Sequence, residues 1–327
     1  MNTRRRFHWV FGAALLAAAL PGVAQQQRKL RRVAIFGASS QTARPYFDAF
    51  RNGMRERGWS DGVNIEYRVV NTEGRMGELD ALAMRMVAEE PDVIFASLGQ
   101  YIRAAQKATR SIPIVMGAGS DVVANGFVQS LARPGGNITG MTTLVEETLA
   151  KLFEIMHEIL PAAKRIAFLV NETHPSAEVF TRRAQETCNT LGLRMIRVVV
   201  NSPDKLEGAF ASITANKAQG VVVMPDTVFF VNTKQIVDRL RRAKLPGAFA
   251  VREGPVAGGV FSYAGKFLDS YRYAASYVDR ILRGAQPRDL PVEQTATYEL
   301  VVNQKAAREL GIRFPQSVLV RADEVLE

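Results

Sequence analysis

The chain has 327 residues, of which 47% are hydrophobic, and a formal net charge of +10 at pH 7. This length is enough for two domains with full cores. The basic residues are spread along the chain and form no motif with interleaved aromatic residues, which argues against a nucleic-acid partner and favours a mildly basic surface. The single cysteine, Cys188, excludes an internal disulfide framework.

The beginning of the chain has the features of a targeting segment. Arg4–Arg6 form a positively charged start, and Val10–Leu20 is an apolar stretch too short to span a bilayer. Gly22–Ala24 supplies the small residues that a signal peptidase requires. We therefore expect residues 1–24 to be a signal peptide and the mature protein to be periplasmic. Sec export is the simpler route, and Thr3–Phe7 also fits a twin-arginine signal loosely.

Strands and helices alternate in the first part of the chain. The apolar runs Val33–Phe36 and Val93–Ala96 are typical of buried strands, and Val63–Val69 alternates as a half-buried strand does. Apolar residues recur at helical spacing over residues 47–54 and 76–87. This alternation with short connections predicts a parallel sheet covered by helices on both faces.

The stretch Ile112–Met141 marks the crossing between two such series. It begins with an apolar strand, Ile112–Met116, and passes through small and polar residues to the turn Arg133–Gly136. A second strand, Asn137–Met141, follows. We interpret this stretch as the last strand of one α/β lobe, the rim of a cleft and the crossing into the other lobe.

A second series of strands and helices follows, with strands predicted at Ile166–Val170, Met195–Val200 and Val221–Met224. Val260–Tyr263 and the helix Phe267–Leu282 are expected to return to the first lobe. The predicted fold class is therefore α/β, with two Rossmann-like lobes whose parallel sheets are joined by a three-strand hinge. The expected division is residues 30–143 and about 251–288 for lobe 1, and residues 144–250 and about 289–327 for lobe 2.

Three separated motifs resemble one protein family. They are Ser130–Gly140, then Leu290–Gln294 followed by Tyr298–Asn303, and finally Leu319–Val325. In this order they are similar to the signature of bacterial ABC-transporter substrate-binding proteins, the family that includes the tryptophan-type periplasmic binding proteins. The resemblance runs from about Arg31 to the end of the chain.

This resemblance implies a type I periplasmic binding protein fold, in which two lobes close on a ligand like a Venus flytrap. It implies an amino-acid-like ligand, with aromatic amino acids among the candidates. It also implies delivery of that ligand to the transmembrane subunits of an ABC permease.

Polar residues follow the apolar runs of both series. Ligands of open parallel sheets bind beyond the carboxyl ends of the strands, so residues in these loops are candidates for a binding site. The predicted ligand-binding residues are Ser39, Ser40, Ser97, Gln100, Asp121, Asn171, Ser176, Asp226 and Tyr263. Taken singly, each of the loop serines and aspartates also fits a helix cap or a turn.

The residue types suggest how a ligand would be held. The helix that begins near Gly99 and Gln100 suits a carboxylate, because its first N–H groups are free and its dipole end is positive. Asp121 and Asp226 suit a cation such as an α-ammonium group. Tyr263, or alternatively Phe229, is suited to stacking on an apolar or aromatic ligand.

Motifs for other chemistry are weak. Gly117–Gly119 lacks the third small residue of a dinucleotide site, and the sequence contains neither a P-loop nor a hydrolase elbow. His174 lies in a cleft-side loop without a cysteine or histidine at metal spacing, so a ligand contact suits it better than a metal. We expect no catalytic residue, no metal and no cofactor, and a monomer that binds a small molecule.

Three alternative functions remain open at this point. The same receptor fold could serve a membrane sensor kinase in place of a permease. An exported hydrolase would need a nucleophile–base pair, which the sequence does not offer. A repressor with the same lobes would need an N-terminal DNA-binding helix pair, where the export signal stands.

Overall fold

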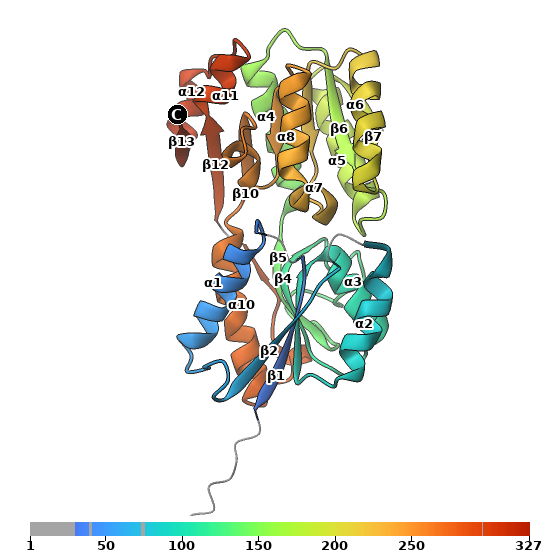
Figure 1. Ribbon diagram of the computed structural model, residues 1–327, viewed down its shortest axis with the longest axis vertical. Coiled ribbons are helices and arrows are strands. Elements are labelled where there is room, and N and C mark those ends of the chain that lie inside the picture. The colour runs from blue at the N-terminus through green and yellow to red at the C-terminus, as the bar shows by residue number, and fades with distance from the viewer. Residues whose placement is uncertain (1–29, 39–40, 73–75, 296) are drawn as a thin grey trace, which may run out of the picture.

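The chain forms two lobes that lie end to end along the long axis of the molecule (Figure 1). The computed structural model describes residues 30–38, 41–72, 76–295 and 297–327. The predicted signal peptide and the predicted site residues Ser39 and Ser40 lie outside the described residues. Within these ranges, no helix is both long and apolar enough to cross a membrane.

In the described residues, the first lobe is built on a six-stranded parallel sheet with the order β11-β5-β4-β3-β1-β2. Its strands are β1 (Arg31–Phe36), β2 (Ile65–Val70), β3 (Val93–Leu98), β4 (Ile114–Ser120), β5 (Ile138–Thr143) and β11 (Glu293–Gln294). Two layers of helices cover the sheet (Figure 1). One layer pairs α1 (Arg44–Arg55) with α10 (Phe267–Leu282), and the other pairs α2 (Leu79–Ala88) with α3 (Gly99–Ala108). The short 3-10 helices of this lobe are Met76–Glu78 and Pro287–Asp289.

The second lobe contains, as far as the structure describes it, a seven-stranded sheet with the order β13-β12-β10-β9-β8-β6-β7. Its neighbours are parallel except for the antiparallel pair β10 and β12. The strands are β6 (Arg165–Val170), β7 (Arg194–Val199), β8 (Gly220–Val223), β9 (Gly247–Phe249), β10 (Phe261–Gly265), β12 (Tyr298–Asn303) and β13 (Glu324–Leu326). The helices are α4 (Val145–Ile159), α5 (Ala177–Thr190), α6 (Leu206–Ala215), α7 (Thr227–Val231), α8 (Thr233–Arg242), α9 (Glu253–Val256), α11 (Gln304–Glu309) and α12 (Gln316–Arg321), with a 3-10 turn at Pro203–Lys205.

The burial of the strands follows their place in the sheet. The central strand β4 is buried along its whole length, which requires apolar or small residues on both faces. The edge strand β2 has a mixed pattern and keeps only Ile65 fully buried. Each lobe has its own hydrophobic core, so each series of strands and helices folds around its own sheet.

The close packing of α1 on α10 depends on Gly53. A Cβ atom at this position would lie 2.3 Å from the backbone oxygen of Arg272 and 2.8 Å from the Cβ of Ala275. Only glycine allows this approach, because the nearest obstacle is backbone and cannot move aside. The contact holds the two helices side by side, and both begin at the edge of the first lobe that faces the second lobe (Figure 1).

The chain passes between the sheets at three places within the described residues: after β5, after β10 and between β11 and β12. The prediction that Val260–Tyr263 returns to the first lobe is wrong, because β10 pairs with β9 and β12 in the second sheet. The return begins with α10. Conversely, the predicted division assigns β11 to lobe 2, but this strand pairs with β5 in the first sheet. The apolar pattern identifies a buried strand, whereas its partner depends on contacts distant in the sequence.

Candidate functional site

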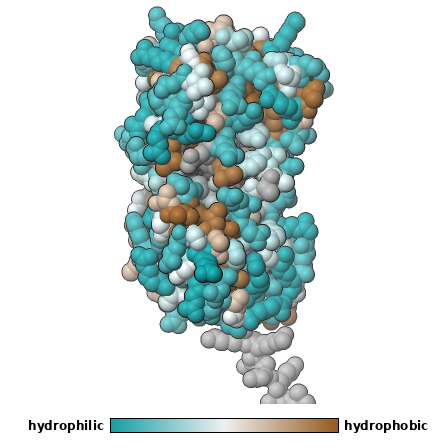
Figure 2. All heavy atoms as spheres, turned by 180° about the vertical axis from the view of Figure 1, so that it is seen from behind, coloured by the Kyte–Doolittle hydropathy of each residue, from teal (hydrophilic) through white to brown (hydrophobic). Residues whose placement is uncertain are grey.

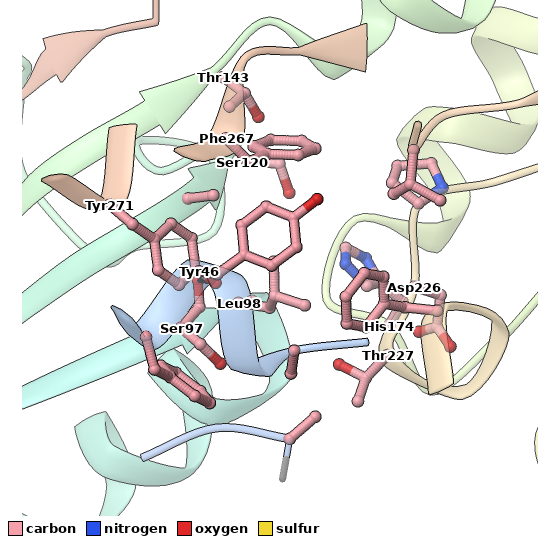
Figure 3. Close-up of a pocket in the computed structure, with 18 residues that line it drawn as sticks. Tyr46, Ser97, Leu98, Ser120, Thr143, His174, Asp226, Thr227, Phe267 and Tyr271 are labelled. Carbon is pink, nitrogen blue, oxygen red and sulfur yellow. Dashed lines mark hydrogen bonds between the residues drawn. The ribbon is translucent and has the colours of Figure 1, made fainter. Parts of the chain in front are cut away.

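A cavity lies between the lobes, at the carboxyl ends of the central strands (Figure 3). The cavity has a volume of about 60 Å³. One water needs roughly 10–15 Å³, so the cavity has room for several waters. Seen from behind, most of the outer surface is hydrophilic, and hydrophobic residues gather at the level where the lobes meet (Figure 2).

The first lobe contributes an aromatic wall. Tyr46 and Phe47 come from the first turn of α1, and Phe267 and Tyr271 come from the beginning of α10. The Tyr271 ring is central to this wall, because its centroid lies 5.4 Å from that of Tyr46 and 6.3 Å from that of Phe47. The Tyr271 hydroxyl donates a hydrogen bond of 3.2 Å to the backbone oxygen of Ser97, which fixes the ring against β3.

The second lobe contributes a buried carboxylate, Asp226, which lies just beyond β8 and is 5% exposed. Its Oδ1 accepts a hydrogen bond of 2.7 Å from the backbone N–H of Val228, which caps α7. Nδ2 of Asn171 lies 3.1 Å from both carboxylate oxygens. Burial raises the pKa of Asp226 to about 6, although the hydrogen bonds from Asn171, from the α7 backbone and from Gln100 act in the opposite direction.

His174 faces the same cavity from the loop after β6 (Figure 3). Its Nδ1 accepts a hydrogen bond of 3.1 Å from the backbone N–H of Ser176. In the neutral imidazole the proton then lies on Nε2, because one ring nitrogen donates and the other accepts. Burial lowers the pKa of His174 to about 4, so the ring is neutral at physiological pH and Nε2 is a hydrogen-bond donor.

Several buried polar atoms at the cavity lack a partner. In the described part of the chain, neither Oγ of Ser97 nor Oγ1 of Thr227 makes a hydrogen bond, and both residues line the cavity. Ser97 is 2% exposed and Thr227 is 1% exposed, so bulk water does not compensate for the missing bonds. Buried polar atoms are normally paired, and unpaired ones in a cavity point to a polar ligand.

Five of the predicted ligand-binding residues lie at or next to the cavity. Ser97 and Asp226 line it, and Asn171 and Gln100 lie behind Asp226, to which their side chains hydrogen-bond. Ser176 is 1% exposed and accepts a hydrogen bond of 2.7 Å from Nδ2 of Asn125 in the first lobe. It therefore contributes to the contact between the lobes.

Two other predicted residues lie elsewhere. Asp121 has a positive φ of 49° and lines a separate crevice with Thr142–Leu144, at the connection between β5 and α4. Tyr263 stacks on Tyr298, with ring centroids 5.8 Å apart and an angle of 12° between the planes. Neither is among the residues that line the cavity.

Sequence reasoning did not identify the aromatic wall. Tyr46, Phe47, Phe267 and Tyr271 belong to helices, and their spacing also fits a helical core face. A signal was nevertheless present. A helix that follows a parallel strand begins at the carboxyl edge of the sheet, so aromatic residues in its first turn are close to the cleft.

The described residues contain no group of three or more His, Cys, Asp or Glu side chains that could hold a metal ion. The residues that line the cavity offer a carboxylate, a neutral imidazole, hydroxyl groups and aromatic rings. This set can hold a small molecule with both a charged end and an apolar body.

The model of the ABC transporter substrate binding protein family matches residues 35–326. A tyrosine-binding protein of Clostridioides difficile (strain R20291) is 24% identical over 282 residues, which cover 85% of this chain and 81% of that protein.

Two solved structures are also similar. An ABC domain from Streptococcus pneumonia in complex with L-Trp has a TM-score of 0.83 at 22% identity, covering 91% of this chain and 100% of the other. The ligand-free, open structure of a substrate binding protein with adhesive properties from Clostridium difficile has a TM-score of 0.64 at 22% identity, covering 91% and 99%. These likenesses show the type I periplasmic binding protein fold.

Proposed function

Because the chain belongs to the ABC transporter substrate binding protein family, we propose that it binds a free amino acid with an aromatic side chain and delivers it to an ABC permease. The observation that carries this proposal is the cavity between the lobes, which places an aromatic wall opposite a buried carboxylate. The relatives named above, one tyrosine-binding and one in complex with L-Trp, support the same class of ligand.

Asp226 would hold the α-ammonium group. No lysine or arginine of the described chain forms an ion pair with this carboxylate. A buried charge without a counter-ion is costly, and its raised pKa reflects that cost. An ammonium group in the cavity would supply the missing charge and favour the ionised carboxylate.

The ligand carboxylate would lie at the beginning of α3. Leu98 precedes this helix and has no side chain that caps it, so the first N–H groups of the helix remain available. The unpaired Oγ of Ser97 lies directly before this turn. Nε2 of His174 is a further donor near this turn. A Cβ atom built on Gly99, the first residue of α3, would lie 3.3 Å from this nitrogen.

The ligand side chain would pack against Tyr46, Phe47, Phe267 and Tyr271, with Phe230 of α7 opposite them. Aromatic faces prefer edge-on or offset contacts with other rings, which add to the gain from apolar burial. A phenol or indole ring fits such a wall better than a sugar does, since a sugar would leave many of its hydroxyl groups unpaired.

We infer that the lobes are closed in this structure. The ligand complex and the open structure have the same sequence identity to this chain, 22%, yet their TM-scores are 0.83 and 0.64. The difference is consistent with a lobe arrangement close to that of the complex. A ligand that contacts both lobes stabilises this arrangement, because some of its contacts exist only in the closed form.

Proteins of this family act outside the cytoplasm, and we propose the periplasm as the compartment and residues 1–24 as the export signal. We also propose that the protein binds without catalysing a reaction. Nδ1 of His174 is engaged by the Ser176 backbone and its pKa is about 4, so the imidazole is a poor general base. Coupling to a sensor kinase instead of a permease is the alternative, and uptake of labelled ligand by vesicles containing the permease would distinguish the two.

Calorimetry on the mature chain tests the ligand class. We expect L-tyrosine or L-tryptophan to bind at least about 100-fold more tightly than L-alanine, given the aromatic area to be buried. Tyramine lacks the carboxylate and 3-(4-hydroxyphenyl)propionate lacks the ammonium group, so both should bind much more weakly than L-tyrosine. Equal binding of all these compounds, or preference for a sugar, would contradict the proposal.

A further inference from the structure

Tyr46 lies where the cavity meets the second lobe. Its ring lines the cavity and is 6% exposed. Its hydroxyl donates a hydrogen bond of 2.5 Å to Oε1 of Glu253, the first residue of α9. Because α9 packs on β9, β10 and β12 of the second sheet, this bond connects the two lobes directly.

A second contact joins Tyr46 to the other lobe. The ring of Phe230 in α7 lies 5.8 Å from the Tyr46 ring, with an angle of 71° between the planes. Phe230 is 9% exposed and is buried within the core of the first lobe, although α7 belongs to the second. Opening the lobes would expose this apolar area and break the hydrogen bond at the same time.

The environment of Glu253 makes Tyr46 an important partner. The neighbouring Arg252 forms ion pairs with Glu299 at 3.5 Å and Glu324 at 2.8 Å, so its guanidinium is engaged elsewhere. In the described residues, the second carboxylate oxygen of Glu253 is buried without a hydrogen-bond partner. Closure of the lobes therefore removes water from this carboxylate and replaces it with the Tyr46 hydroxyl. A hydrogen bond from a hydroxyl to a carboxylate is charge-assisted and stronger than one between neutral groups.

We propose that the Tyr46–Glu253 hydrogen bond is a latch that holds the lobes closed and sets how long the ligand stays bound. The same side chain provides a wall of the cavity, so a ligand that packs on the ring also fixes the direction of the hydroxyl. Occupancy and closure are coupled through one residue. The role in ligand release rests on the proposed function, whereas the role in closure does not.

The contact between Asn125 and Ser176 provides a contrast. It also joins the lobes, with 2.7 Å between Nδ2 and Oγ, but neither residue lines the cavity. The Tyr46–Glu253 pair combines an interlobe bond with a ligand-facing ring.

Removing the hydroxyl of Tyr46 tests the latch. Tyr46→Phe keeps the ring and loses the bond, so release of L-tyrosine, measured by stopped flow, should become roughly tenfold faster with little change in the association rate. L-tryptophan serves as a second probe. The control is Tyr273→Phe, since Tyr273 donates to Glu293 at 3.1 Å within the first lobe and lies away from the cavity. Its release rate should equal that of the wild type.

A double-mutant cycle separates the bond from other effects of the substitution. Glu253→Gln retains an acceptor without charge and should accelerate release about threefold. The double variant Tyr46→Phe/Glu253→Gln should release ligand no faster than Tyr46→Phe alone, within about twofold, because both changes remove one interaction. Additive effects would show that the two side chains act independently and would overturn the latch.

A ligand-free measurement decides the role in closure. Spin labels at Arg85→Cys in α2 and Arg182→Cys in α5, both exposed positions, report the distance between the lobes, and the buried Cys188 stays unlabelled. Tyr46→Phe should shift the distances toward the open form, and Tyr273→Phe should not. Identical distances in Tyr46→Phe and the wild type would overturn the latch. If no variant binds either amino acid, the proposed ligand class fails and these distances still test the latch.

Discussion

The two walls of the cavity differ in chemistry. The first lobe presents the rings of α1 and α10, and the second lobe presents Asp226, Thr227 and His174. Figure 3 shows the two sets facing each other across the cavity. The rings of Tyr46 and Phe47 also contact that of Tyr271, so these three rings are packed together within the first lobe.

The difference suggests an order of events. An apolar surface that is already assembled can accept the body of a ligand before the lobes close. When the lobes close, the carboxylate and the imidazole of the second lobe contact the polar groups of the ligand. Only a ligand with complementary charges stabilises the closed form. The aromatic rings would therefore select for the shape of the ligand, whereas Asp226 would select for its ammonium group and His174 would add a donor to the carboxylate site at the beginning of α3.

Neutralising Asp226 should have the largest effect. Asp226→Asn keeps the size of the side chain and removes the partner of the ammonium group, so affinity for L-tyrosine should fall about 100-fold, or about 3 kcal/mol. Calorimetry measures this change. Asp121→Asn is the matched control, because Asp121 lies outside the cavity lining, and should change affinity less than about twofold. Unchanged affinity in Asp226→Asn would remove this carboxylate from the site.

Truncating the aromatic wall should have the next largest effect and should alter selectivity. Phe267 is half-buried at the beginning of α10, so its loss should affect the cavity more than the core. Phe267→Ala should weaken L-tyrosine binding about thirtyfold, or about 2 kcal/mol, and L-alanine binding far less. Competition assays with both amino acids measure the ratio. An equal loss for both would mean that the ring does not contact the ligand side chain.

Lowering the pH should weaken binding through Asp226. Its pKa is raised to about 6, and a bound ammonium group favours the ionised form, so protons compete with the ligand. From pH 7 to pH 5 we expect the dissociation constant to rise about tenfold. His174 has a pKa of about 4 and remains neutral over most of this interval. In Asp226→Asn the dissociation constant should no longer depend on pH in this interval. If the pH dependence persists, another group causes it.

The stability of the ligand-free protein should depend on pH in the opposite direction to ligand binding. The pKa of Asp226 is higher in the folded state than the unfolded value of about 3.9. Protonation therefore favours the folded state, and this carboxylate lowers stability as the pH rises through about 6. Thermal unfolding without ligand between pH 4 and pH 7 measures this contribution.

Among these substitutions, removal of the hydrogen-bond donor of His174 should have the smallest effect on affinity. His174→Phe keeps a ring against Phe180, whose centroid is 5.2 Å away, and loses the Nε2 proton. A hydrogen bond from a neutral donor to a carboxylate contributes about 1.5 kcal/mol, so affinity should fall about tenfold. His174→Gln retains an N–H donor and should recover most of the loss. If the two variants bind equally, the imidazole does not donate to the ligand.

The strands and helices were largely predictable from the sequence, because burial on one or both faces leaves a period of 2, a period of 3.6 or a continuous apolar run. The assignment of β10 to the first lobe failed, since Phe261–Gly265 shows burial and not the identity of its neighbours. Asp226 and Ser97 were found because both directly follow a buried strand. The sequence did not identify Tyr46 and Tyr271 as site residues, because an aromatic residue on a helix has the same spacing whether it faces a core or a cavity.

By itself, the sequence determined the two series of alternating strands and helices and the polar loops at the strand ends. Each of these depends on residues that are close along the chain. The tertiary structure alone decided which helices supply the aromatic wall, and that Glu253 meets Tyr46 from the other lobe. These contacts join segments more than 200 residues apart, as with Tyr46 and Glu253, and they arise from how the two lobes pack and not from any local pattern.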